Sequence, residues 1–328
     1  MRRWTALWFI KSRAKAEHKE PRIEKMPIIE IDNLTKDYET GFARKRKTRA
    51  LDGLSLTVEP GQIFGFLGAN GAGKTTTLKL LMRLIFPTAG TARILGRDVS
   101  DTSMHARIGY LPEAPYFYDY LTAREFLNYC GELFGLNQAT RTRRSEDVLT
   151  RVNLEKKSWD RQLRKFSKGM LQRVGLAQAI VNDPEIVFLD EPMSGLDPVG
   201  RREVRDLIAA LRDEGKTVFM CSHILSDIEV LCDSVAILKG GRLAHAGSLN
   251  ELRAGETSLI EIIATDADAE ALRKSLSIDA EVNTTPSGLR IQVADEREVD
   301  AVIAALRSVN GKLVSVQPVR QSLEELFM

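Results

Sequence analysis

The stretch QIFGFLGANGAGKTT, residues 62–76, decides the fold of this chain. A short apolar run leads into a glycine-rich loop, and a lysine and threonines follow the loop. Gly68–Thr75 fits the pattern GxxxxGK[ST], which connects a buried strand to a helix and holds polyphosphates. The glycines let backbone N–H groups curl around phosphates, and the first turn of the helix adds a partial positive charge. We therefore expect an α/β fold that binds ATP or GTP at this turn.

Two side chains of the loop have expected roles of their own. Lys74 is expected to reach the β and γ phosphates, and the Thr75 hydroxyl is expected to ligate Mg²⁺. The expected nucleotide-binding residues of the loop are Gly68, Ala69, Asn70, Gly71, Ala72, Gly73, Lys74, Thr75 and Thr76.

A second group of residues follows other apolar runs. Asp190 and Glu191 end the run EIVFLDE, and His223 follows TVFMCS. Open α/β sheets bind ligands at the carboxyl ends of their strands, so these side chains are expected at the same edge as Lys74. We expect Asp190 to hold Mg²⁺, Glu191 to orient or deprotonate the attacking water, and His223 to reach the γ-phosphate.

The helix that begins near FSKGM, residues 166–170, leaves two interpretations open. Ser167 is either a plain N-cap or, with Gly169, part of a second anion-binding helix terminus. The residues alone favour the cap.

Strands and helices alternate from Ile28 onward, which predicts a parallel sheet covered on both faces. We expect one domain over residues 27–248, with a helical insertion at about 121–182 and a last strand SVAILKGGRLAHAG at 234–247. Residues 257–328 follow as a small α+β domain in the order β-α-β-β-α-β, which is ferredoxin-like. This domain has no Cys, His or glycine-rich loop, so we interpret it as a packing or dimerisation module.

Composition excludes several classes of protein. The chain has 328 residues, of which 43% are hydrophobic, so it is not mainly disordered. Its 47 Lys+Arg and 45 Asp+Glu give a net charge of +2, and no nucleic-acid partner is expected. Three cysteines without CxxC spacing indicate a reducing, cytoplasmic compartment, and the longest apolar runs are strand-sized. Residues 1–26 are basic and are interpreted as a disordered extension, or alternatively as a segment that touches a membrane surface.

Taken in order, these motifs resemble the nucleotide-binding subunit of ATP-binding cassette (ABC) transporters over residues 28–247. The resemblance implies an ABC-type P-loop ATPase that uses ATP and Mg²⁺ as a homodimer. It also implies a separate membrane-spanning permease that keeps the chain at the cytoplasmic face of the membrane. Tyr38 would stack on adenine, Glu113 would ligate Mg²⁺, and Ser167, Gly169 and Asp197 would belong to the surface that meets the opposite subunit's nucleotide.

Two positions depart from the family pattern. Glu113 stands where glutamine is usual, and the signature reads FSKGM instead of LSGGQ. Lys168 could offset the charge of Glu113. With the C-terminal domain and the closing SLEELF, these departures resemble the ATPase subunits of bacterial exporters. Four aromatic residues then form the expected contact with a permease helix: Tyr116, Phe117, Tyr118 and Tyr120.

Two alternatives remain open from the sequence. One is a soluble ABC-type ATPase that acts on ribosomes or nucleic acid, although such relatives usually carry two cassettes or a long coiled coil. The other is a binding or regulatory module without turnover, against which Glu191 and His223 argue.

Overall fold

The computed structural model describes residues 26–40, 46–250, 259–278, 280–285 and 288–319. The expected N-terminal extension lies outside the described residues except for Met26, and so does the closing SLEELF. The strands are β1 (Ile29–Thr40), β2 (Arg46–Val58), β3 (Ile63–Gly68), β4 (Ala89–Ile94), β5 (Arg97–Asp98), β6 (Ile108–Leu111), β7 (Ile186–Asp190), β8 (Thr217–Ser222), β9 (Ser234–Lys239), β10 (Arg242–Ser248), β11 (Leu259–Thr265), β12 (Glu281–Thr285), β13 (Gly288–Val293) and β14 (Lys312–Val319).

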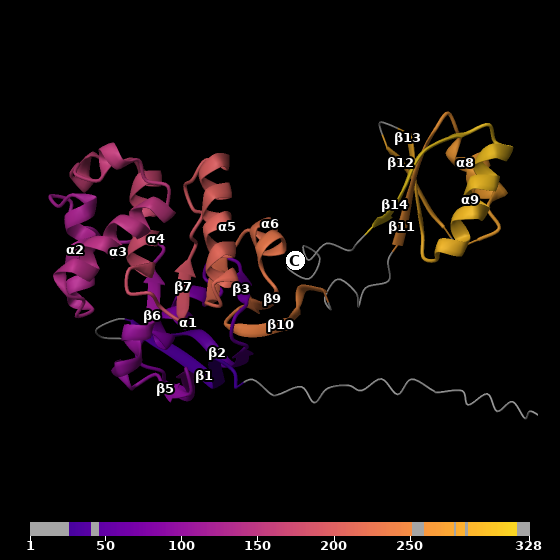
Figure 1. Ribbon diagram of the computed structural model, residues 1–328. Coiled ribbons are helices and arrows are strands. Elements are labelled where there is room, and N and C mark those ends of the chain that lie inside the picture. Colours follow the sequence, from indigo (N-terminus) through magenta and orange to yellow (C-terminus); the bar gives the residue numbers. More distant parts are fainter. Residues whose placement is uncertain (1–25, 41–45, 251–258, 279, 286–287, 320–328) are drawn as a thin grey trace, which may run out of the picture.

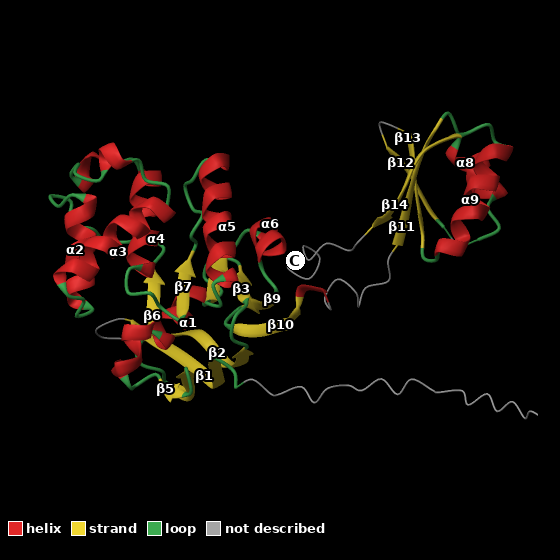
Figure 2. Cartoon of the chain, in the orientation of Figure 1, coloured by secondary structure: helices red, strands yellow, loops and turns green. Residues whose placement is uncertain are grey.

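The helices are α1 (Lys74–Leu81), α2 (Ala123–Leu133), α3 (Gln138–Arg151), α4 (Lys168–Ile180), α5 (Pro198–Asp213), α6 (Leu225–Leu231), α8 (Ala269–Ser275) and α9 (Glu296–Ser308) (Figure 2). Short 3₁₀ turns occur at Thr102–Arg107, Lys156–Ser158 and Leu163–Lys165. None of the helices in the described part of the chain is long and apolar enough to cross a bilayer.

The central sheet has six strands in the order β10-β9-β3-β8-β7-β6 (Figure 1). Its strands run parallel, apart from β10, which is antiparallel to β9. Every residue of β3, β7 and β8 is buried, as expected for a parallel sheet covered on both faces. The carboxyl ends of these three strands therefore meet at one edge of the sheet.

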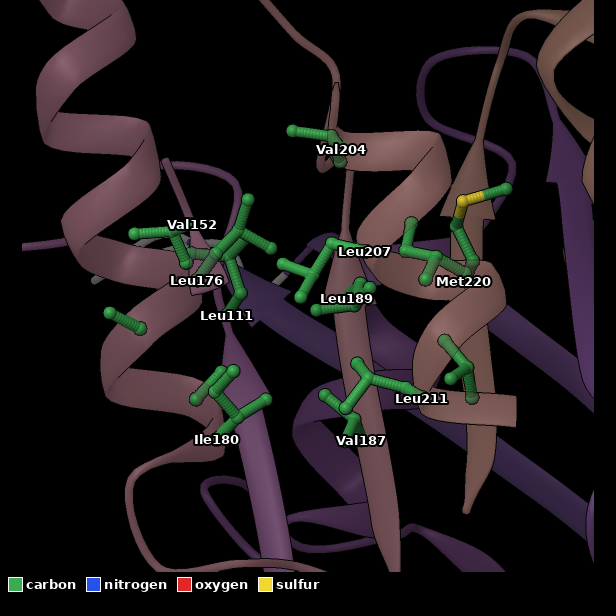
Figure 3. Close-up of a cluster of buried hydrophobic side chains, with 14 of the residues drawn as sticks. Leu111, Val152, Leu176, Ile180, Val187, Leu189, Val204, Leu207, Leu211 and Met220 are labelled. Atoms are coloured by element: carbon green, nitrogen blue, oxygen red, sulfur yellow. The ribbon is translucent and has the colours of Figure 1, made fainter. Parts of the chain in front are cut away.

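The two faces of the central sheet have different covers. On one face, α4 and α5 pack aliphatic side chains against β6, β7 and β8, and Figure 3 shows Leu176 and Leu207 facing Leu111 and Leu189. The other face carries the rings of Phe66 and Phe188, each tilted against the ring of Phe219, and packs against α1 and a second sheet. This core fixes the strand ends that carry the polar residues.

The second sheet is antiparallel, in the order β2-β1-β4-β5. The sequence pattern predicted a single parallel sheet from Ile28 onward and did not indicate that these strands form a sheet of their own. Their partners are set by contacts between distant segments, such as Ile29 with both Val58 and Ile94, which no local pattern encodes.

One expected strand was wrong. SVAILKGGRLAHAG forms two antiparallel strands, β9 and β10, instead of one. Gly240 and Gly241 occupy the turn with φ values of 57° and 81°, a pair of positive angles that tight hairpin turns require and glycine adopts without steric cost.

The helical segment within residues 121–182 consists of α2, α3 and α4, which pack on one another. Helix α2 begins with a capping box between Thr122 and Glu125. Helix α4 also packs on β6 and β7, so it belongs to the cover of the central sheet as well as to the helical segment.

The C-terminal part, described by itself, has the expected element order β11-α8-β12-β13-α9-β14. Its four strands form an antiparallel sheet in the order β12-β13-β11-β14. Ile262 and Ile291 on the sheet and Leu272 and Leu306 on the helices form a separate core.

Candidate functional site

The glycine-rich loop turns sharply between β3 and α1. Gly71 and Gly73 have φ values of 83° and 110°, and Gly73 is the N-cap of α1. A Cβ atom on Gly73 would lie 2.6 Å from the carbonyl oxygen of Ala50, so both the angle and the space require glycine there. The loop is thus fixed with the N-terminus of α1 at its end.

Lys74 is the first residue of α1, and only 6% of it is exposed. Its Nζ donates to the Gly68 carbonyl at 2.6 Å and lies 3.6 Å from Glu191 Oε1. The ammonium group is therefore held at the loop while it faces the carboxylate that follows β7.

Asp190 ends β7 and is completely buried beside Cys221 of β8. Among the described residues, neither carboxylate oxygen has a partner with hydrogen-bond geometry. Burial raises the pKa of Asp190 to about 6; the Thr75 hydroxyl opposes this rise, and Glu113 and Glu191 add to it. A buried carboxylate without partners, next to a hydroxyl group, is a set of oxygen ligands that Mg²⁺ prefers.

Glu191 has a positive φ of 51°, which is strained for a residue with a side chain and costs about 1–3 kcal/mol. Its N–H donates to the Cys221 carbonyl at 3.0 Å. Only 8% of its side chain is exposed, and its Oε1 lies 2.9 Å from His223 Nδ1. The buried carboxylate thus stands between an ammonium group and a half-exposed imidazole, which is an arrangement suited to a general base.

Lys74 and Glu191 line a cavity of about 300 Å³, which is large enough for a small ligand. Asp190 and His223 adjoin Glu191 but are not among the lining residues. Glu113, which follows β6, reaches the same cavity and is exposed. The cavity is lined by Ala50, Ala69, Asn70, Gly71, Gly73, Lys74, Thr75, Thr76, Glu113 and Glu191. Ala50 was missed by the sequence analysis, because its methyl group carries no chemistry and β2 is distant in sequence.

Gly68, Ala72 and Tyr38 do not line this cavity. Gly68 accepts the bond from Lys74, and Ala72 is buried in the core beneath the loop. Tyr38 lies on β1 opposite Thr48, and Lys36 Nζ is 5.2 Å from its ring centroid. The structure therefore does not bring the Tyr38 ring together with the loop residues in this cavity.

The remaining predicted residues lie on a different surface. Ser167, Gly169 and Asp197 line a depression of about 680 Å³, which shares no lining residue with the first cavity. Ser167 is the N-cap of α4, and its side chain accepts from the Met170 N–H at 3.3 Å. Asp197 is the N-cap of α5, and its Oδ1 accepts from the Gly200 N–H at 2.8 Å. Within one chain, the predicted site is therefore divided between two surfaces.

Several known proteins resemble this chain. Residues 51–194 match the family model described as ABC transporter. An uncharacterized ABC transporter ATP-binding protein of Synechocystis is 45% identical over 310 residues, which cover 93% of this chain and 86% of that relative. A Nod factor export ATP-binding protein of Ralstonia nicotianae is 33% identical over 296 residues, which cover 88% of this chain and 87% of that relative.

A solved structure shows the same fold. It is the dimeric structure of a post-hydrolysis state of an ATP-binding cassette bound to ADP and Pi, with a TM-score of 0.63 and 25% identity. The match covers 67% of this chain and 98% of that cassette. The sequence identity, the shared fold and the glycine-rich loop lead to one conclusion: this chain belongs to the ABC transporter ATP-binding proteins and is a P-loop ATPase.

Proposed function

We propose that two copies of this chain pair to hydrolyse Mg²⁺-bound ATP and thereby drive export through a separate membrane-spanning subunit. The observation that carries the proposal is the division of the site between two surfaces. The cavity at Lys74 and the depression at Ser167 share no residue, so one chain alone does not enclose a nucleotide with both. A second copy would bring its Ser167, Gly169 and Asp197 to the nucleotide held at Lys74.

The chain's own residues divide the chemistry among themselves. Thr75, Asp190 and Glu113 would hold Mg²⁺, a fit supported by the buried, unpartnered oxygens of Asp190. The cation would offset the negative charge of the phosphate oxygens. Lys74 binds the β and γ phosphates, and Glu191 takes a proton from the attacking water. His223, whose Nδ1 lies 2.9 Å from Glu191 Oε1, reaches the γ-phosphate.

Tyr38 is proposed to contact adenine at the outer end of the cavity. Its strand β1 pairs with β2, and Ala50 of β2 lines the cavity two residues beyond the Tyr38 partner Thr48. Gly68 and Ala72 are proposed to support the phosphate-binding turn through their backbone.

The contact for a permease helix is proposed at the aromatic segment after Glu113. Tyr116, Tyr118 and Tyr120 are exposed, and Tyr118 packs edge-on against Tyr129 of α2 at 5.6 Å. Phe117 does not share this surface, since it packs at 5.3 Å against the buried Phe126. The segment follows Glu113 directly in the chain, so a helix seated on the tyrosines could move a residue that lines the cavity.

The direction of transport and the location rest on the relatives. The relative from Ralstonia nicotianae is named as an export protein, which supports export by this chain. We infer a peripheral location at the cytoplasmic face of the membrane, where the permease would hold the chain. The domain expected at residues 257–328 is proposed to serve packing or dimerisation, and no nucleic-acid partner is proposed.

The proposal is tested with the full-length Glu191→Gln variant, which should bind ATP without hydrolysing it. With ATP and Mg²⁺, light scattering should show a dimer, whereas Lys74→Ala should stay monomeric under the same conditions. If Glu191→Gln stayed monomeric while calorimetry showed that it binds ATP, the proposed pairing would be contradicted.

The membrane partner is tested by purifying tagged Glu191→Gln from its native cells in detergent with ATP and Mg²⁺. Recovery of a stoichiometric polytopic membrane protein would support the transporter subunit. Recovery of ribosomes or nucleic acid instead would support the soluble ATPase and contradict the proposal.

A further inference from the structure

The turn that carries Glu191 needs support from its surroundings. Glu191 is held at a φ of 51°, and the next residue is the buried Pro192. A strained backbone angle persists only where neighbouring groups fix it from several sides. The position of the Glu191 carboxylate between Lys74 and His223 therefore depends on what holds this turn.

Within the part of the chain that the structure describes, three hydrogen bonds hold the turn. Two join backbone groups: the Glu191 N–H donates to Cys221 at 3.0 Å, and the Ser194 N–H donates to the Glu191 carbonyl at 3.1 Å. The third comes from a side chain, because Gln172 Nε2 donates to the Pro192 carbonyl at 2.8 Å. Only this third bond depends on the identity of a side chain.

Gln172 is a buried polar residue, with 5% exposed, and it lies on α4. Its amide and the Pro192 carbonyl are both removed from water, so each needs the other as its partner. An apolar side chain in its place would leave the carbonyl without a donor. Nothing in the spacing of the sequence predicts this contact, because the two residues are 20 positions apart.

Helix α4 also carries the second surface of the site. Its N-cap is Ser167 and Gly169 lies in its first turn, so Gln172 follows Gly169 by less than one helical turn. One helix thus carries Ser167 and Gly169, which line the depression, and the side chain that holds the Glu191 turn. A shift of the N-terminus of α4 would be carried to Pro192 through Gln172.

We infer that Gln172 is a positioning residue that fixes Glu191 for catalysis and links it to the Ser167 surface of the same chain. The inference rests on the proposed function, in which Glu191 is the general base. Gln172 itself does not line the cavity at Lys74. Its effect should therefore appear in the rate of the chemical step rather than in the binding of ATP.

The test compares three full-length variants with the natural chain. Gln172→Met keeps the length of the side chain and removes the donor, and we expect kcat to fall about tenfold or more while KM for ATP changes less than twofold. Gln178→Met is the matched control, because it makes the same change on the same helix at a partly buried position. It should leave kcat within twofold of the natural chain.

Gln172→Glu adds a second readout. An ionised carboxylate would repel the Pro192 carbonyl, whereas a protonated carboxyl group would donate to it. Relative to the natural chain at each pH, kcat of Gln172→Glu should rise as the pH falls from 8 to 6, and kcat of Gln172→Met should show no such rise. This variant decides the matter if Gln172→Met does not fold.

Two results would overturn the inference. One is an unchanged kcat in Gln172→Met, and the other is a ratio of kcat between Gln172→Glu and the natural chain that does not vary between pH 8 and pH 6. Glu191→Gln separates this failure from failure of the proposed function: if it is inactive while Gln172→Met is fully active, only the role of Gln172 is wrong.

Discussion

Lys168 lies directly across Gly195. A Cβ atom on Gly195 would come within 2.5 Å of both Cε and Nζ of Lys168, and Gly195 has a φ of 70°. The lysine therefore occupies space that only a glycine leaves open. Gly195 lines the same depression as Ser167, whereas Glu113 lines the other cavity. Because Lys168 lies against a residue of the depression and Glu113 lines the other cavity, we expect any offset of their charges to act between paired subunits.

We therefore expect Gly195→Ala to displace Lys168 and to lower the ATPase rate about tenfold or more, as Lys168→Ala should. The two changes should not be additive, because they disturb the same contact. The rates of the single and double variants form a cycle that checks this expectation. A second cycle with Lys168→Ala and Glu113→Gln tests the offset of charge between subunits, and additive effects would refute that offset.

Glu191→Gln should lower kcat by roughly 10²- to 10⁴-fold, the range expected when a positioned base is removed. The amide keeps the shape of the side chain but takes no proton. Steady-state phosphate release gives the rate, and calorimetry should show that the variant still binds ATP. An unchanged rate would assign the proton transfer to another group.

Lys74→Ala should abolish measurable ATP binding, because it removes the buried ammonium group that is proposed to bind the phosphates. Calorimetric titration of the purified chain measures this directly. Lys79→Ala is a suitable control, since Lys79 lies on the same helix and is exposed. Normal affinity in Lys74→Ala would contradict the assignment of the loop.

Asp190→Asn should change the pH dependence of stability. The pKa of Asp190 is raised from 3.8 to about 6, so the folded chain binds more protons than the unfolded chain between these values. The free energy of unfolding then falls as the pH rises through this window, and the cost of the buried charge, about 3 kcal/mol, is fully present above pH 6. Asparagine carries no such charge.

Urea unfolding without nucleotide or divalent cations checks this expectation. Asp190→Asn should be more stable than the natural chain at pH 7.5, and the difference should disappear toward pH 4. A difference that does not vary with pH would show that the charge of Asp190 is not its cause.

The double change Tyr116→Ser and Tyr120→Ser should leave the ATPase rate of the isolated chain unchanged and prevent recovery of the membrane partner. These side chains are 85% and 61% exposed, so their loss costs the fold little. Phe86→Ser is the matched control, because Phe86 is 62% exposed on another segment. If the natural chain, the double variant and Phe86→Ser recovered equal amounts of the membrane partner, the contact would have to lie on another surface.

The sequence predicted those parts of the site in which chemistry and spacing coincide. The loop at Lys74 has a fixed pattern, and Asp190 and Glu191 follow a buried run that had to end at the same sheet edge. The contacts of Ala50 and of Gln172 could not be predicted, because each joins residues far apart in sequence through groups that many proteins carry. The hairpin at Gly240 was missed because apolar residues continue on both sides of the two glycines.

The separation of Ser167 from Lys74 has a consequence for mixed populations. In the proposed pair, each nucleotide needs Lys74 from one chain and Ser167 from the other. If chains with a damaged Ser167 surface are mixed with natural chains, the fraction of fully intact pairs follows the square of the natural fraction. Conversely, two inactive variants, one altered at Lys74 and the other at Ser167, would together form one complete site. Whether a site is active would therefore depend on both chains of the pair and not on either chain alone.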